Sequence, residues 1–180
     1  MFDPPSRYTS KSHTSIELIL RPIAPDDLPF LLTWQYEPPY AIYSLGDGRT
    51  NPDILAEAAD YFLDPVYRFY SMLDADSGKL TAVVSYGLDG QVPGGDYSEE
   101  ALDIGFAVRP DLTGQGLGGD FVGAAINFAI YTFHPGKLRV TIADFNRRAR
   151  RVWEKHGFQP VQTFHSDAND LAFTIFTRER

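Results

Sequence analysis

The residues best suited to chemistry lie between positions 108 and 121, where four glycines separate two apolar runs. They stand at positions 114, 116, 118 and 119. A loop without side chains lets a ligand approach the backbone closely, and a helix that begins there presents unpaired NH groups and the positive end of its dipole. The pattern therefore predicts a site for a phosphorylated ligand.

Two classes of ligand fit the glycines. The spacing Gly114-x-Gly116-x-x-Gly119 satisfies the dinucleotide-binding fingerprint, and Asp144 ends the next predicted strand, where a ribose-binding acid is wanted. However, residues 109–113 separate the preceding strand from the first glycine, the loop lies past the middle of the chain, and 36 residues follow Asp144. That remainder is too short for the second half of a dinucleotide fold, which argues against a dinucleotide. A coenzyme A is the other ligand that such glycines allow.

A second motif lies downstream of the glycines. It is Asn146-x-x-Ala149-x-x-x-Trp153-x-Lys155-x-Gly157-Phe158. Together the two motifs resemble the GNAT superfamily of acyl-CoA-dependent N-acetyltransferases, and the match spans about residues 103–158. The N-terminal part is similar more loosely: Leu20 to Leu28, followed by Trp34, resembles the branch of ribosomal-protein N-terminal and aminoglycoside acetyltransferases.

The resemblance implies a set of acetyl-CoA contacts. The strand before the loop would pair with the pantetheine arm, the loop would hold the pyrophosphate, Arg109 would be a phosphate ligand, and Asn146 would orient the arm. The implied cofactor-binding residues are Phe106, Ala107, Val108, Arg109, Thr113, Gly114, Gln115, Gly116, Leu117, Gly118, Gly119, Asn146 and Trp153. Asp103 stands where many relatives have a general base, although a polar residue on the solvated side of that strand explains it equally well.

The chain departs from the family pattern at two positions. Thr113 replaces an Arg or Gln that braces the loop, so its hydroxyl or the backbone must do so instead. Trp153 replaces a Tyr that in many relatives protonates the departing thiolate, and an indole NH is too weak an acid for that role. Tyr36, Tyr40, Tyr43 and Tyr86 are the candidates for a substitute acid.

The elements that must position these residues follow from periodicity, prolines and caps. We expect strands at about 15–21, 67–73, 80–88, 101–108, 137–143, 159–165 and 171–177, and helices after Pro25, from Asn51 to about Leu63, from the loop to about Phe133, and from about Asn146 to His156. This mixed order predicts an α+β (mixed α/β) fold rather than a doubly wound sheet. The resemblance implies a mostly antiparallel twisted sheet of six to seven strands with about four helices, splayed between the strands at 101–108 and 137–143.

Length and composition limit the partners. A chain of 180 residues that is 43% hydrophobic predicts one domain at 15–180, preceded by a flexible polar arm at 1–14. No apolar run is long enough to span a membrane, and the arm lacks the apolar segment of a secretory signal, so a cytoplasmic location is expected. The chain has no cysteine, and its histidines have no partners at metal-ligand spacing, so no metal is expected. A homodimer is compatible with the resemblance.

The charge is uneven. The net charge is −8, which argues against nucleic acid and favours a cationic acceptor, yet residues 134–158 hold seven basic residues against two acidic ones. Two hypotheses follow. The first is an enzyme in which a neutral amine attacks acetyl-CoA directly, with a backbone NH near Val108 polarising the carbonyl. The second is a module that binds acyl-CoA but has lost efficient transfer.

Overall fold

The computed structural model describes residues 6–8 and 15–180. Its strands are β1 (Ser6–Tyr8), β2 (Leu18–Pro22), β3 (Phe69–Asp74), β4 (Leu80–Tyr86), β5 (Leu102–Val108), β6 (Lys137–Ala143), β7 (Gln159–His165) and β8 (Ala172–Glu179). Its helices are α1 (Leu28–Leu31), α2 (Pro52–Phe62), α3 (Gly118–Phe133) and α4 (Arg147–Lys155). The rest of the predicted arm lies outside the described residues, so its flexibility stays a prediction.

The strands form one sheet in the order β1-β2-β3-β4-β5-β6-β8-β7. Every neighbouring pair is antiparallel except β5 and β6, which are parallel. The predicted α+β class and the mostly antiparallel sheet are thus confirmed, and residues 15–180 contribute seven strands. The arm adds the short β1 as an eighth strand, which the sequence analysis did not anticipate.

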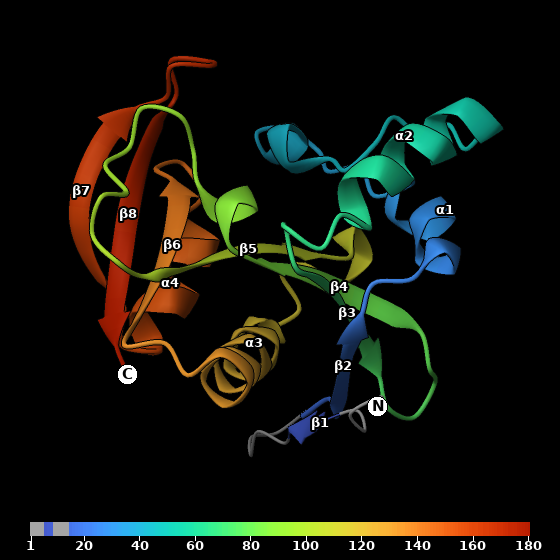
Figure 1. Ribbon diagram of the computed structural model, residues 1–180, viewed down its shortest axis with the longest axis horizontal. Coiled ribbons are helices and arrows are strands. Elements are labelled where there is room, and N and C mark those ends of the chain that lie inside the picture. Colours follow the sequence, from blue (N-terminus) through green and yellow to red (C-terminus); the bar gives the residue numbers. More distant parts are fainter. Residues whose placement is uncertain (1–5, 9–14) are drawn as a thin grey trace.

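The splay between β5 and β6 is also confirmed. Their parallel ladder contains two residue pairs, Leu102 with Leu138 and Asp103 with Arg139. Beyond this second pair both strands continue, to Val108 and Ala143, without pairing to each other. The sheet therefore consists of two half-sheets, β1–β5 and β6–β8–β7, that separate along most of the shared edge (Figure 1).

Helices cover the two faces of the sheet. Side chains alternate between the faces along each strand, so Ala82, Val84 and Tyr86 pack with α3, whereas Val83 packs with α1 and α2. Figure 1 shows α1 and α2 above the first half-sheet and α3 below it. The largest core lies under α3 and α4 and a smaller one under α1 and α2, and a third cluster forms in the second half-sheet around Phe164 and Phe173.

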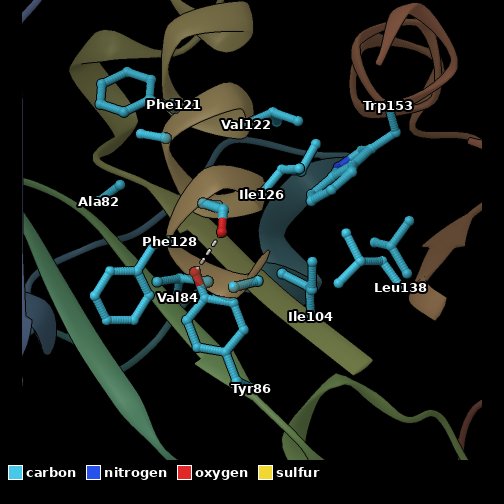
Figure 2. Packing of buried hydrophobic residues seen from close by; sticks show 14 of the residues in the cluster. Ala82, Val84, Tyr86, Ile104, Phe121, Val122, Ile126, Phe128, Leu138 and Trp153 are labelled. Atoms are coloured by element: carbon cyan, nitrogen blue, oxygen red, sulfur yellow. Dashed lines mark hydrogen bonds between the residues drawn. The ribbon is translucent and has the colours of Figure 1, made fainter. Parts of the chain in front are cut away.

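Figure 2 shows the larger core at close range. The Tyr86 hydroxyl donates a hydrogen bond of 2.8 Å to the Ala125 carbonyl of α3, and Trp153 reaches into this core from α4. Helix α3 is apolar around most of its circumference because it is enclosed by the sheet and α4. At 16 residues it is nevertheless too short to cross a membrane, and no other helix in the described residues could do so.

Local signals account for most element boundaries. Asn51 caps α2 by accepting a 3.1 Å hydrogen bond from the Ile54 NH, as its position before Pro52 predicts. The expectation that the first strand runs from 15 to 21 and stops before Pro22 is wrong at both ends, because β2 begins at Leu18 and includes Pro22. Pro22 pairs with Tyr70 at the end of the ladder, a position where a strand tolerates proline.

Candidate active site

The glycine loop, residues 113–117, connects β5 to α3 through a short 3-10 turn at Pro110–Leu112. Gly114 and Gly116 have φ angles of 75° and 83°, a left-handed conformation that disfavours any side chain. A Cβ on Gly118 would lie 3.1 Å from Val152 Cγ2, so this glycine lets α3 approach α4. The loop thus delivers a bare helix N-terminus at the end of β5, which suits an anionic group.

The lead-in to the loop is held by its own side chains. The Thr113 hydroxyl donates a 2.8 Å hydrogen bond to the Pro110 carbonyl, and the Gln115 amide donates one of 2.6 Å to the Asp111 carbonyl. Thr113 therefore braces the loop through its hydroxyl, which is one of the two possibilities, hydroxyl or backbone, that the sequence left open. Gln115 supplies a second brace from the other side of Gly114.

One residue of the basic segment reaches the glycine loop. A Cβ on Gly114 would lie 3.2 Å from Arg148 Nη1, and the Arg148 guanidinium lies 4.1 Å from the centre of the Tyr40 ring. Arg150 instead pairs with Glu154 on its own helix. Arg109 is held by Asp111 and by the Leu80 carbonyl, so it is committed to the loop's own structure and is poorly placed as a phosphate ligand. Arg148, one of the seven basic residues in the segment 134–158, lies nearer to the loop.

A cleft of about 480 Å³ passes through the splay. The inner walls come from β5 (Ile104 to Ala107) and β6 (Val140 to Ile142). Helix α4 and its cap line the cleft through Asn146, Ala149 and Trp153, and Tyr43 lies next to Asn146. The remaining lining comes from residues 42, 44 and 45, from α2, from residues 89, 90, 92 and 93, and from the β7–β8 turn. The cleft thus connects the face that carries the glycine loop with the opposite face.

The backbone of β5 is free to bond within this cleft. The Gly87 NH donates to the Asp103 carbonyl, and the Arg109 NH donates to the Thr81 carbonyl. The backbone groups of Asp103, Arg109 and the odd-numbered residues between them therefore face β4. Because this direction alternates along a strand, the NH and carbonyl groups of Ile104, Phe106 and Val108 face the other edge. The Val108 carbonyl already accepts a hydrogen bond from the Tyr36 hydroxyl, and the last parallel pair with β6 uses the Ile104 NH. The NH and carbonyl of Phe106 and the NH of Val108 are therefore the groups that an extended ligand in the splay can reach.

Asp103, the residue expected as a general base, lies in a buried ion pair. It is 3% exposed and forms two hydrogen bonds, of 2.6 and 2.8 Å, with Arg139, which is also 3% exposed. The Gln91 amide donates a third bond, of 2.8 Å, to the same carboxylate. Asp103 lies neither on the solvated side of the strand nor in the wall of the cleft. It joins β5 to β6 at the last residue pair before the splay.

Helix α4 contributes a cap and an aromatic wall. Asn146 Oδ1 accepts a 3.1 Å hydrogen bond from the Ala149 NH at the start of the helix, which orients its amide nitrogen as a donor at the cleft. Trp153 is buried, and its ring meets the Phe106 ring edge-on at 6.1 Å between centroids. Trp153 therefore supports the cofactor-side wall by packing, in keeping with its lack of acidity.

Of the four candidate tyrosines, Tyr43 is best placed as an acid. Tyr86 bonds α3 on the opposite face of the sheet, the Tyr36 hydroxyl donates to the Val108 carbonyl at 2.6 Å, and Tyr40 lies against Arg148. Tyr43 lines the cleft, and its buried oxygen lies near Asn146 and Ala143 without a hydrogen bond of good geometry to any described residue. Burial raises its pKa, so the phenol keeps its proton at neutral pH.

One acidic residue in the cleft was missed from the sequence. Asp89, in a 3-10 turn after β4, accepts hydrogen bonds from the Ser85 and Tyr61 hydroxyls, and all three residues line the cleft. Its only local signal is the flanking pair Gly87 and Gly90, which marks a turn and not a site. The described residues contain no group of three or more His, Asp or Glu side chains arranged for a metal ion.

The family model for the acetyltransferase (GNAT) domain matches residues 17–159. The chain belongs to the GNAT acetyltransferase family. Acetyl-CoA is the cosubstrate of this family, so the recognition made from the two sequence motifs is confirmed. No curated protein matches the chain significantly in sequence.

Solved structures of GNAT proteins share the fold. The spermidine N-acetyltransferase of Vibrio cholerae, in complex with CoA and spermine, is 17% identical with a TM-score of 0.69, over 90% of this chain and 95% of that chain. A GNAT-family acetyltransferase of Bacillus anthracis is 12% identical with a TM-score of 0.65, over 96% of this chain and 98% of that chain. At these identities the likeness shows the fold alone.

The residues present fit the GNAT cosubstrate. The bare N-terminus of α3 and Arg148 suit a pyrophosphate, and the free edge of β5 with the Phe106 and Trp153 rings suits an extended, partly apolar arm. Asn146 offers an amide donor along that path. The pantetheine arm of acetyl-CoA thus finds matching groups in the cleft, and the pyrophosphate finds them at the glycine loop and Arg148.

Proposed function

We propose that this GNAT protein acetylates a cationic primary amine that enters the cleft from the face opposite the glycine loop. The observation that carries the proposal is the cleft itself, whose lining extends from Trp153 of α4 through the splay to Asp89 and to Tyr61 of α2. Two substrates that enter from opposite faces can meet at β5 without either one leaving. That arrangement suits direct transfer with no covalent enzyme intermediate.

The chemical class of the acceptor is inferred from charge. The net charge of −8 attracts cations, and the solved Vibrio cholerae relative holds spermine. Polyamines, aminoglycoside-like compounds and protein N-termini are the acceptor classes that we propose to compare. They share an ammonium group that must lose a proton before its nitrogen can attack.

The roles of the residues follow from their positions. Acetyl-CoA supplies a thioester whose carbonyl carbon is open to attack. The NH groups of Phe106 and Val108 face the splayed edge of β5 and can polarise that carbonyl, and Tyr36 holds the Val108 carbonyl so that this end of β5 keeps its orientation. Tyr43 then gives a proton to the departing sulfur.

The alternative function is a module that binds acyl-CoA without efficient transfer. Trp153 favours it, because the position that carries an acidic phenol in many relatives carries an indole here. A thermal-shift titration with CoA and acetyl-CoA, followed by CoA thiol release with spermidine, kanamycin and a peptide with a free N-terminus, separates the two functions. We expect a rise in Tm of about 5–10 °C at 100-fold excess over Kd, and thiol release with at least one amine.

The thermal-shift and thiol-release results together distinguish the transferase from the binding module. A rise in Tm with no thiol release across the panel supports the module and overturns the transferase. If neither CoA nor acetyl-CoA changes the Tm, both functions fail, and NAD becomes the ligand to test against the glycine loop.

Replacement of Tyr43 by phenylalanine should slow transfer without harming the fold. We expect kcat to fall by about 100-fold, the lower end of the range for general acid catalysis, because thiolate is a tolerable leaving group. KM for acetyl-CoA and the Tm should change little, since the lost hydroxyl has no hydrogen bond of good geometry among the described residues. Steady-state kinetics and thermal denaturation check these values.

Tyr86→Phe is the matched control. It removes a buried hydroxyl that bonds the Ala125 carbonyl on the opposite face, so it should lower stability by about 1 kcal/mol and leave kcat unchanged. An unchanged kcat in Tyr43→Phe would remove Tyr43 from the reaction.

A further inference from the structure

The walls of the cleft carry very little charge. Among the described residues that line it, Asp89 is the one with an ionisable carboxylate, and no lysine, arginine or histidine joins it. The remaining lining is aliphatic, aromatic, hydroxyl, amide and glycine. A cation that enters this space therefore meets one opposite charge, in surroundings that strengthen the attraction relative to water.

The carboxylate of Asp89 is held in position from two sides. Oδ1 accepts from the Tyr61 hydroxyl of α2, and Oδ2 accepts from the Ser85 hydroxyl of β4. Burial, and then the hydrogen bond to Asp89, raise the pKa of Tyr61, so this phenol remains a donor. Each carboxylate oxygen keeps a further lone pair for another donor, because a carboxylate accepts about four hydrogen bonds.

Gly105 brings this carboxylate against the strand that faces the acetyl-CoA side. A Cβ at position 105 would overlap Ser85 Oγ and lie 2.6 Å from Asp89 Oδ2. The turn that carries Asp89 also packs on β5, since a Cβ on Gly90 would lie 2.9 Å from the Ile104 carbonyl carbon. Asp89 is thus seated directly beside Gly105, and the next residue, Phe106, turns its backbone groups into the cleft.

We propose that Asp89 binds the ammonium group of the acceptor and takes a proton from it. This inference rests on the proposed acetyl transfer and assigns its acceptor subsite. Tyr61 and Ser85 are positioning residues, because they hold the carboxylate without needing to touch the amine. The acceptor is accordingly an alkyl ammonium, and a neutral hydroxyl or amide would lack the attraction that this site provides.

The protons and electrons balance as follows. The ammonium nitrogen gives one proton to Asp89, and its lone pair forms the C–N bond to the thioester carbonyl carbon. The C–S bond breaks with its electron pair on sulfur. The second proton lost by nitrogen reaches that sulfur by way of Tyr43, and Asp89 releases its proton to solvent, leaving an N-acetyl amide and a free thiol.

The test compares Asp89→Asn with Asp96→Asn in the full chain. Asp96 caps an exposed turn in the neighbouring loop through the Ser98 NH, so it undergoes the same chemical change outside the cleft. With the most active amine among spermidine, kanamycin and the free-N-terminus peptide, we expect kcat/KM for the amine to fall by about 10²- to 10³-fold in Asp89→Asn. The rise in Tm with CoA should persist, and Asp96→Asn should match the wild type.

The variant Asp89→Glu and the wild type separate a failure of the Asp89 assignment from a failure of the proposed function. Asp89→Glu retains the charge, so it should bring KM for the amine back to within about tenfold of wild type, even if kcat stays low because the carboxylate is displaced. A wild type that acetylates none of the amines overturns the proposed function and the Asp89 assignment with it. An active wild type with an equally active Asp89→Asn, or an Asp89→Asn that only lowers the Tm, overturns Asp89 alone. If Asp89→Asn does not fold, the test uses Asp89→Glu alone. A KM for the amine that rises about 10²- to 10³-fold in Asp89→Glu, although the charge is retained, then also overturns the assignment of Asp89.

Discussion

Gly116→Glu abolishes measurable binding of CoA. The loop at this glycine has a φ of 83°, so any side chain strains it by about 1–2 kcal/mol, and a carboxylate at the start of α3 occupies and repels the place of an anionic ligand. A Cβ at position 116 meets no protein atom within 4 Å, which allows the protein to remain folded. We expect the rise in Tm with CoA to disappear and Kd to weaken by more than about 100-fold, as measured by calorimetry.

The chain offers a closely matched control in Gly78→Glu. Gly78 has a φ of 66°, also has no protein atom within 4 Å of a Cβ, and lies in the β3–β4 hairpin away from the cleft. It receives the same strain and the same charge, so its Tm should fall about as far as that of Gly116→Glu while CoA affinity stays unchanged. Binding at wild-type affinity in Gly116→Glu would refute the assignment of the glycine loop to the cosubstrate.

Arg139→Met should be the most destabilising of these substitutions. It leaves the Asp103 carboxylate buried with a single hydrogen bond from Gln91, in place of the two further bonds from Arg139. Removing one partner of a buried ion pair costs about 3–5 kcal/mol, which corresponds to a fall in Tm of roughly 10 °C for a chain of this size. Chemical denaturation gives the free energy of unfolding directly.

The double variant Asp103→Leu with Arg139→Met tests whether the Asp103–Arg139 ion pair has a structural role or a catalytic one. Apolar residues of similar volume commonly replace a buried ion pair without loss, so we expect the double variant to recover most of the stability. It should also retain acetyl transfer, because the carboxylate is committed to Arg139 and lies outside the cleft. A folded but inactive double variant would restore Asp103 as the general base.

The parts of the site that the sequence predicted are encoded locally. The glycine loop depends on backbone conformation at consecutive residues, and the capping role of Asn146 depends on Ala149 three positions later. The same applies to β6, whose bounds at Lys137–Ala143 agree with the expected range. Short-range spacing carries all of this information, which is why a single sequence suffices for it.

The features of the site that the sequence did not reveal depend on distant partners. Asp103 was interpreted from the alternation of its own strand, but its environment is created by Arg139, 36 positions away, at the last parallel pair. Asp89 becomes a site residue because Tyr61 and Gly105 meet it from two other elements. Spacing along the chain contains neither relation, so only the folded arrangement reveals them.

The joint between the two half-sheets has a mechanical consequence. Beyond the Asp103–Arg139 pair, β5 continues for five residues to Val108, a lever of about 16 Å at the usual rise per residue. A rotation of only about 5° at the joint moves the far end by roughly 1.4 Å, close to the length of one carbon–carbon bond. The rigidity of this buried ion pair therefore bears on how large an acyl group the cleft accepts.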